Sequence, residues 1–266
     1  MKHLLFTILL LAHFAQPLTA RARTLDGYPK LFFNYSWLFD QAVCGPTGVA
    51  QSSRSANSQS QTSHSNDSRL SSPSSATAPA PSSTPNPDRW NNESETWAQE
   101  AIAKEPYFTQ TWESNAPDLF TVLFAKFKGR FSRKEMSATL SVCPKVRSFS
   151  SPLVLKVTWY LKSYMGDKPV LPQEGWITLV YHELLHTWVD ENLSQSKLLE
   201  KYKDEPSAVK NHLHLMALEQ FTYINAGKPE LLKWIEIDYR KAKDAYARSW
   251  EIVQKEGYQA FIAEFK

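Results

Sequence analysis

The sequence lacks the residues that indicate several common kinds of protein. Its 266 residues include only 2 cysteines, which excludes a disulfide-dense miniprotein and a four-cysteine zinc or iron–sulfur site. The 30 Lys and Arg residues nearly balance the 27 Asp and Glu residues, and a net charge of +3 is too small to indicate a nucleic-acid-binding protein. No internal repeat is visible. The length and the 42% of hydrophobic residues suffice for one large or two small domains with a hydrophobic core.

The first 22 residues have the pattern of a secretory signal peptide. Lys2 precedes an apolar run over residues 4–12 that is too short to span a bilayer. Residues 20–22 (Ala-Arg-Ala) fit the small-x-small rule for cleavage before Arg23. No later stretch reaches the roughly 18 apolar residues of a spanning helix. We therefore expect a secreted or periplasmic protein with no membrane span after signal removal.

Residues 51–87 differ in composition from the rest of the chain. They hold fourteen serines and five prolines with a single large apolar side chain, so they are predicted to form a disordered linker or insertion. They separate an aromatic segment, residues 23–50, from a main domain over residues 88–266. The aromatic segment is too apolar to be solvated alone, so we expect it to pack on the main domain. Export permits a disulfide between Cys44 and Cys143, which we predict holds it there.

Hydrophobic periodicity predicts a helix-rich α+β fold, with a small sheet preceding the helix that carries the motif described next. The expected strands cover residues 136–142 and 153–161. Helices are expected, besides a short one at the C-terminus, over residues 92–103, 107–127 (interrupted at 115–117), 176–193, 206–225 and 230–255.

Residues 182–186 read His-Glu-Leu-Leu-His within one of these helices. A spacing of four places His182 and His186 on one face, so both imidazoles can reach one ion. Glu183 lies about 100° around the helix, close enough to hold a water molecule without ligating the metal. Imidazole nitrogen suits zinc, which lowers the pKa of bound water towards ~7, and Glu183 would accept its proton as general base.

The surroundings of this motif favour a metal site over a chance match. A helix that is apolar on nearly all sides is buried, and histidines and a glutamate inside it are costly unless they are paired or bound to metal. The flanking apolar residues are Leu179, Val180, Leu184, Leu185, Trp188 and Val189. The sequence therefore predicts a single zinc ion, Zn2+, at this helix.

The stretch 176–193 resembles the active-site helix of the zincin metallopeptidases, and the resemblance extends over about residues 150–225. It implies zinc on His182 and His186, with Glu183 as general base acting on a peptide or protein substrate. The metzincin pattern is not met, because Asn192 stands where its third histidine would fall. A third ligand on a following helix, as in gluzincins, is implied instead.

The strand over residues 153–161 has two interpretations. In zincins an edge strand pairs with the extended peptide substrate through its backbone, and this strand is a candidate for that role. The alternative is an ordinary buried strand.

Two residues of the helix over 206–225 are candidate third ligands. His212 and Glu219 share one face but lie about 10 Å apart along the axis, so one ion cannot bind both. The gluzincin resemblance favours Glu219. We favour His212, which would otherwise be an unpaired buried imidazole, and Glu219 could then orient a ligand histidine. His214 points away and is predicted to be a hydrogen-bonded core histidine.

The leading functional hypothesis is a secreted zinc-dependent hydrolase, specifically a peptidase, with no nucleic-acid partner. One alternative is a non-catalytic zincin-fold binding protein with structural zinc, against which the intact Glu183 argues. Another is a metal-assisted hydrolase of a non-peptide cell-wall bond. Tyr181, Tyr223 and Tyr239 could each supply an oxyanion donor, and the sequence does not choose among them.

Overall fold

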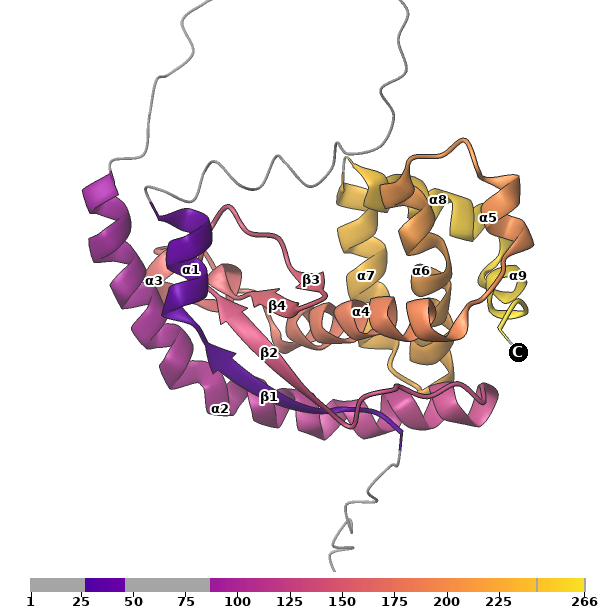
Figure 1. Cartoon of the computed structure of the whole chain (residues 1–266), viewed down its shortest axis with the longest axis horizontal. Helices are drawn as coiled ribbons and strands as arrows, with labels where there is room; N and C mark the ends of the chain where they lie inside the picture. The colour runs from indigo at the N-terminus through magenta and orange to yellow at the C-terminus, as the bar shows by residue number, and fades with distance from the viewer. Residues whose placement is uncertain (1–26, 46–86, 243, 266) are drawn as a thin grey trace, which may run out of the picture.

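The computed structural model describes residues 27–45, 87–242 and 244–265, so the predicted signal peptide and most of the serine-rich segment lie outside the described residues. A small sheet occupies one half of the described structure and a group of helices the other half (Figure 1). This arrangement confirms the predicted helix-rich α+β class. The sheet runs in the order β1 (Lys30–Tyr35), β2 (Glu135–Ser141), β4 (Leu153–Lys156) and β3 (Phe149–Ser150). β1, β2 and β4 are parallel, and β3 is antiparallel to β4.

Helices cover one face of the sheet and build the second half. A short 3-10 helix, η2 (Thr158–Tyr160), follows β4. The α-helices are α1 (Trp37–Cys44), α2 (Pro87–Lys126), α3 (Lys162–Met165), α4 (Gln173–Asn192), α5 (Lys197–Lys201), α6 (Ser207–Asn225), α7 (Pro229–Lys241), α8 (Ala245–Glu256) and α9 (Tyr258–Ile262).

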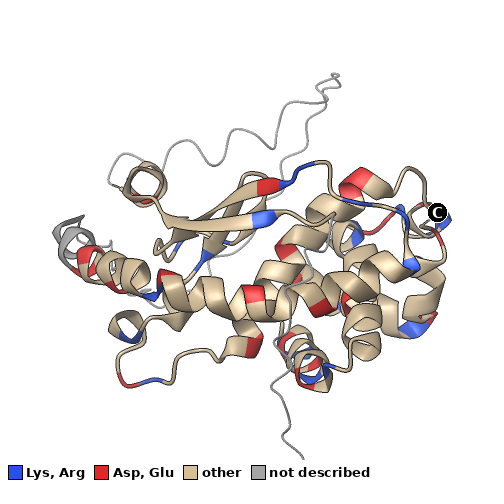
Figure 2. Ribbon diagram, turned by 90° about the horizontal axis from the view of Figure 1, so that it is seen from below, with Lys and Arg blue, Asp and Glu red and all other residues tan. Residues whose placement is uncertain are grey.

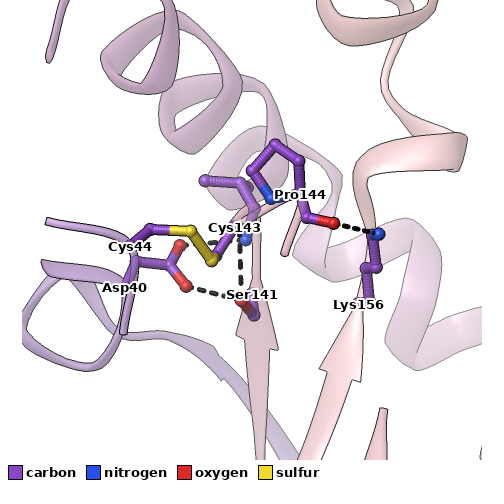
Figure 3. Close-up of a disulfide and its surroundings, with 7 residues drawn as sticks. Asp40, Cys44, Ser141, Cys143, Pro144 and Lys156 are labelled. Atoms are coloured by element: carbon purple, nitrogen blue, oxygen red, sulfur yellow. Dashed lines mark hydrogen bonds between the residues drawn. A yellow bond between two sulfur atoms is a disulfide. The ribbon is translucent and has the colours of Figure 1, made fainter. Parts of the chain in front are cut away.

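The N-terminal segment joins the main body through strand pairing. β1 pairs with β2 in the register Phe33↔Ala138, and alternate residues of β1 are buried against the helices beneath the sheet. The predicted disulfide between Cys44 and Cys143 is present and ties the end of α1 to the end of β2 (Figure 3). Beside it, the buried Asp40 carboxylate accepts hydrogen bonds from the Ser141 hydroxyl and the Val142 backbone N–H.

Aromatic packing places α4 at the centre of the molecule. The Trp176 ring lies 5.4 Å from Phe33 of the sheet and 4.4 Å from Phe108 of α2, and its indole N–H donates to the Phe108 carbonyl. α4 also packs on α6 and α7. Because it has neighbours on all these sides, the helix is apolar around most of its circumference, as expected for a buried helix.

The two helices predicted over residues 92–127 are a single helix, α2, so the interruption predicted at 115–117 is wrong. Pro106 and Pro117 both lie inside it. The Asn115 side chain donates to the Thr111 carbonyl, and residues such as Phe120 are fully buried. Tertiary packing along this face outweighs the cost of the prolines.

The strand predicted over residues 153–161 is shorter than expected and is not an edge strand. β4 ends at Lys156, and the chain then turns into η2. The strand order places β4 between β2 and β3, so both of its sides are paired. The hypothesis that this strand pairs with substrate is therefore wrong.

The long helix predicted over residues 230–255 is also two helices. α7 ends at Lys241, and α8 begins after Asp244, whose side chain accepts a hydrogen bond from the Tyr246 N–H as an N-cap. This break redirects the chain toward α4 and α6, where the predicted metal ligands lie.

Figure 2 shows Lys and Arg interspersed with Asp and Glu over the described elements. Within the described ranges, no helix combines the length and apolar character needed to cross a bilayer.

Candidate metal centre

Three histidines from two helices meet where α4 crosses α6. His182 and His186 come from successive turns of α4, and His212 comes from the second turn of α6. One ring nitrogen from each lies within 4.8 Å of the others, which is close enough to hold a metal ion. The ring centroids are 4.9 to 5.3 Å apart. His182 and His212 are buried, and His186 is half-buried.

The hydrogen bonds of these histidines show which nitrogen is available to a metal. His212 Nδ1 lies 2.6 Å from the Ala208 carbonyl, which can only accept, so Nδ1 carries the proton. His212 Nε2 then carries a free lone pair, and it is buried without a partner among the described residues. His182 Nε2 is buried and unpartnered in the same way. Buried unpaired acceptors are costly, and a cation between them would remove that cost.

A carboxylate and a phenol orient the first of these histidines. His182 Nδ1 lies 3.3 Å from Glu219 Oε1 and 3.1 Å from the Tyr239 hydroxyl, while that hydroxyl donates to Glu219 Oε2 at 2.6 Å. Glu219 and Tyr239 are both buried. Such a carboxylate–histidine pair fixes the ring and its tautomer and raises the basicity of the other nitrogen. Both candidate third ligands therefore lie at the site. His212 belongs to the group of three imidazoles, and Glu219 contacts His182 at Nδ1 rather than at the unpartnered Nε2.

Glu183 is buried beside this cluster. Its side chain is 3% exposed. Burial, and secondarily the nearby Glu219, raise its pKa to about 8. With this pKa Glu183 is protonated at neutral pH unless a cation lies nearby, and its ionised form is the one that can accept a proton from a water molecule.

Burial also decides the charge of the three imidazoles. It lowers the pKa of His182 to about 3 and that of His212 to about 4. The pKa of His186 is lowered by burial and by the neighbouring imidazoles. All three are therefore neutral at neutral pH, which is the state that binds a metal.

Tyr246, which the sequence analysis missed, also faces this cluster. Its ring lies 4.4 Å from that of His212 and 5.6 Å from that of His182. Burial, then the charge of Glu183, raise the pKa of its phenol, so the hydroxyl stays protonated. The N-cap signal at Asp244, two residues earlier, could have shown that a helix starts here, but not that it faces the histidines.

The three tyrosines named from the sequence, and the remaining histidine, have different hydrogen-bond partners in the structure. Tyr239 bonds to Glu219, Tyr181 donates to Thr222, and the Tyr223 hydroxyl is buried without a partner among the described residues. His214 points away from the cluster and bonds to Glu264 at 2.8 Å, as predicted for a core histidine. Tyr239 is the tyrosine of these three whose hydroxyl lies beside a candidate ligand, the imidazole of His182.

The donor set fits a metal that prefers imidazole. Three neutral nitrogens with one open position are typical of catalytic zinc sites, and the adjacent carboxylate suits proton transfer. In the comparisons with family models, curated proteins and solved structures, no match to this chain is found. The resemblance to zincins therefore depends on the motif and on this arrangement of side chains.

Proposed function

We propose that this chain is an exported zinc-dependent peptidase of zincin type, with His182, His186 and His212 as ligands and Glu183 as general base. One observation carries the proposal. Two buried imidazole nitrogens without partners among the described residues converge with a third histidine, beside the buried side chain of Glu183. A structural zinc site would need the imidazoles but not the carboxylate.

The choice of zinc follows from the ligands. Neutral imidazoles select borderline ions such as zinc over the hard cations Mg²⁺ and Ca²⁺, which take oxygen ligands. When bound, zinc supplies Lewis-acid polarisation of a carbonyl and lowers the pKa of a water molecule towards ~7. The third-ligand role of His212 is a prediction that the bond between Glu219 and His182 supports.

The residues around the histidines have complementary roles in this proposal. Glu183 accepts a proton from the attacking water and later transfers it to the leaving amine. A cation nearby favours its ionised form and so offsets the rise in pKa that burial causes. Glu219 and Tyr239 hold His182 in place. Tyr246, protonated and facing the cluster, can donate its O–H to the oxygen on which negative charge develops.

Export is part of the proposal because two independent features favour it. The N-terminal 22 residues have the composition of a signal peptide, and Cys44 is bonded to Cys143. Disulfides persist in oxidising compartments outside the cytosol.

A variant of the general base tests the proposed function. Glu183→Gln should keep one zinc per chain, because Glu183 is not a ligand, while hydrolysis of a mixed peptide library falls by about 10²- to 10⁴-fold. Zinc is measured by mass spectrometry of the metal, and hydrolysis by mass spectrometry of the peptides. Glu174→Gln, in the first turn of the same helix, is the matched control and should behave as wild type.

Each other result selects a different conclusion. Unchanged hydrolysis by Glu183→Gln would remove Glu183 from its role. A zinc-loaded wild type that cleaves no peptide would contradict the peptidase, and a parallel assay on cell-wall muropeptides would then separate a non-peptide hydrolase from a binding protein.

A further inference from the structure

The connection between β2 and β3 carries two exposed cations, Lys145 and Arg147, and the backbone on both sides of Arg147 is anchored. Val146 is buried in a small cluster with Cys44, Cys143 and Val154, and the Ser148 hydroxyl accepts a hydrogen bond from the Lys156 N–H. Arg147 lies between these two anchored residues, and its side chain is 85% exposed. The loop begins just after the disulfide (Figure 3), and its backbone is held on both sides of the solvent-exposed Arg147 guanidinium.

A chain of contacts leads from this guanidinium to the histidine cluster. Arg147 Nη1 lies 3.9 Å from Asp244 Oδ2. Asp244 caps α8 and accepts from the Tyr246 N–H at 3.1 Å, and the Tyr246 ring lies 4.4 Å from that of His212. Arg147 is therefore linked to His212 through Asp244 and Tyr246.

The charge of Arg147 is poorly compensated by its surroundings. A 3.9 Å pair between side chains 85% and 46% exposed contributes little, because water screens it. Lys156 is a second cation nearby, with its amine donating to the Pro144 carbonyl at 2.6 Å (Figure 3). Burial, then repulsion by Arg147, lower the pKa of Lys156. Two neighbouring like charges favour the arrival of an anion.

We propose that Arg147 is a specificity-determining residue that selects substrates bearing a carboxylate close to the scissile bond. This inference rests on the proposed peptidase function. A guanidinium presents parallel N–H donors that match the two oxygens of a carboxylate, and its fixed loop lowers the entropic cost of binding. The carboxylate can belong to an acidic side chain or to the free C-terminus of a peptide.

Charge reversal at two positions of the same loop tests this inference. Arg147→Glu is compared with Lys145→Glu, which makes the same change of charge at an exposed residue two positions earlier in the loop. Cleavage sites in a mixed peptide library are sequenced for the zinc-loaded wild type and both variants. Wild type should favour Asp or Glu at one subsite, or a free rather than amidated C-terminus, by about tenfold, the value of a charge-assisted hydrogen bond near the surface. Arg147→Glu should abolish or reverse that preference, and Lys145→Glu should retain it.

The outcomes distinguish this inference from the function on which it rests. A preference that Arg147→Glu leaves intact, or that Lys145→Glu removes equally, would overturn it. If the wild type cleaves no peptide, the peptidase proposal fails, and binding decides the role of Arg147. A fluorescent peptide containing three glutamates and its glutamine counterpart are then titrated onto the zinc-loaded proteins. Tighter binding of the acidic peptide that is lost in Arg147→Glu alone supports the inference, and equal binding overturns it.

Discussion

His212 and His214 lie two residues apart on α6, yet their surroundings differ in one respect that separates a candidate ligand from a structural histidine. Both are buried. His214 Nε2 finds the Glu264 carboxylate at 2.8 Å, whereas His212 Nε2 has no partner within the described ranges and faces two further imidazoles. Burial alone therefore does not identify a metal ligand. The informative feature is a buried nitrogen whose hydrogen-bonding capacity the described protein leaves unused.

The largest effect should come from removing one histidine or the other. His212→Ala should weaken zinc binding by more than about a hundredfold, beyond the range for residues that only support a ligand. His214→Ala should bind zinc as wild type does, because its ring faces Glu264. Competition with a chelator measures the affinity, and circular dichroism checks that both variants fold. Zinc retained by His212→Ala would transfer the ligand role to Glu219.

Substitution of Glu219, which contacts His182 Nδ1, should have a smaller effect on zinc affinity. Burial raises the pKa of Glu219 to about 8, and a bound cation would favour its ionised form. Glu219→Gln keeps an acceptor for His182 Nδ1 but cannot ionise, so zinc affinity should fall by about tenfold with one zinc still bound at saturation. Tyr239→Phe, which removes the phenol that bonds to Glu219, should act in the same direction and more weakly. Complete loss of zinc from Glu219→Gln would show that Glu219 is itself a ligand.

Removal of the Glu264 carboxylate, the partner of His214, should change the stability of the fold rather than zinc binding. Glu264 accepts hydrogen bonds from Ser196, from His214 and from the backbone N–H groups of Lys197 and Leu198. Glu264→Ala should therefore lower the free energy of unfolding by about 2 kcal/mol, measured by urea denaturation. If this variant lost zinc as His212→Ala is expected to, the two histidines would not be independent.

Acid should affect both histidines in the same direction once zinc is removed. Burial lowers the pKa of His214 below the ordinary 6.5, against the opposing influence of Glu264, and that of His212 to about 4. The unfolded chain takes up these protons below pH 6.5 and the folded chain does not. Stability is thus complete above pH 6.5 and declines toward acid, by about 1.4 kcal/mol per pH unit for each imidazole that stays neutral.

The measurement is urea denaturation of the chelated protein at pH 7, 6 and 5. His214→Phe should flatten the decline by about the contribution of one imidazole. A decline as steep as that of the wild type would show that His214 is already protonated in the folded protein.

The elements that could be predicted are those whose pattern is local. The helix carrying His182 and the helix carrying His212 begin and end within a few residues of their predicted positions, because apolar periodicity and terminal Pro or Gly mark them. Pairing of Cys44 with Cys143 followed from there being only two cysteines. In the site, the spacing of four placed His182 beside His186 without any tertiary information.

What could not be predicted depends on tertiary contacts. Periodicity continues across residues 242–244 with no Pro or Gly, so Asp244 was the one sign of a helix start there, and nothing local showed that this start turns Tyr246 toward His212. Pro117 indicated an end that packing of α2 overrides. The choice between His212 and Glu219 was open because both share one helix face. The separating contact, from Glu219 to His182, joins residues 37 positions apart.

The 40-residue helix α2 has a consequence for how the molecule opens. At 1.5 Å per residue it is about 60 Å long, and it contacts β1 and α3 in one half of the structure and α4 and α6 in the other (Figure 1). Because both halves bury residues of the same helix, neither can unravel without exposing the apolar side chains of the other. Partial unfolding is thereby penalised, and the described structure should open as one cooperative unit. For a chain exported as proposed, that cooperativity is a form of protection against proteases outside the cell.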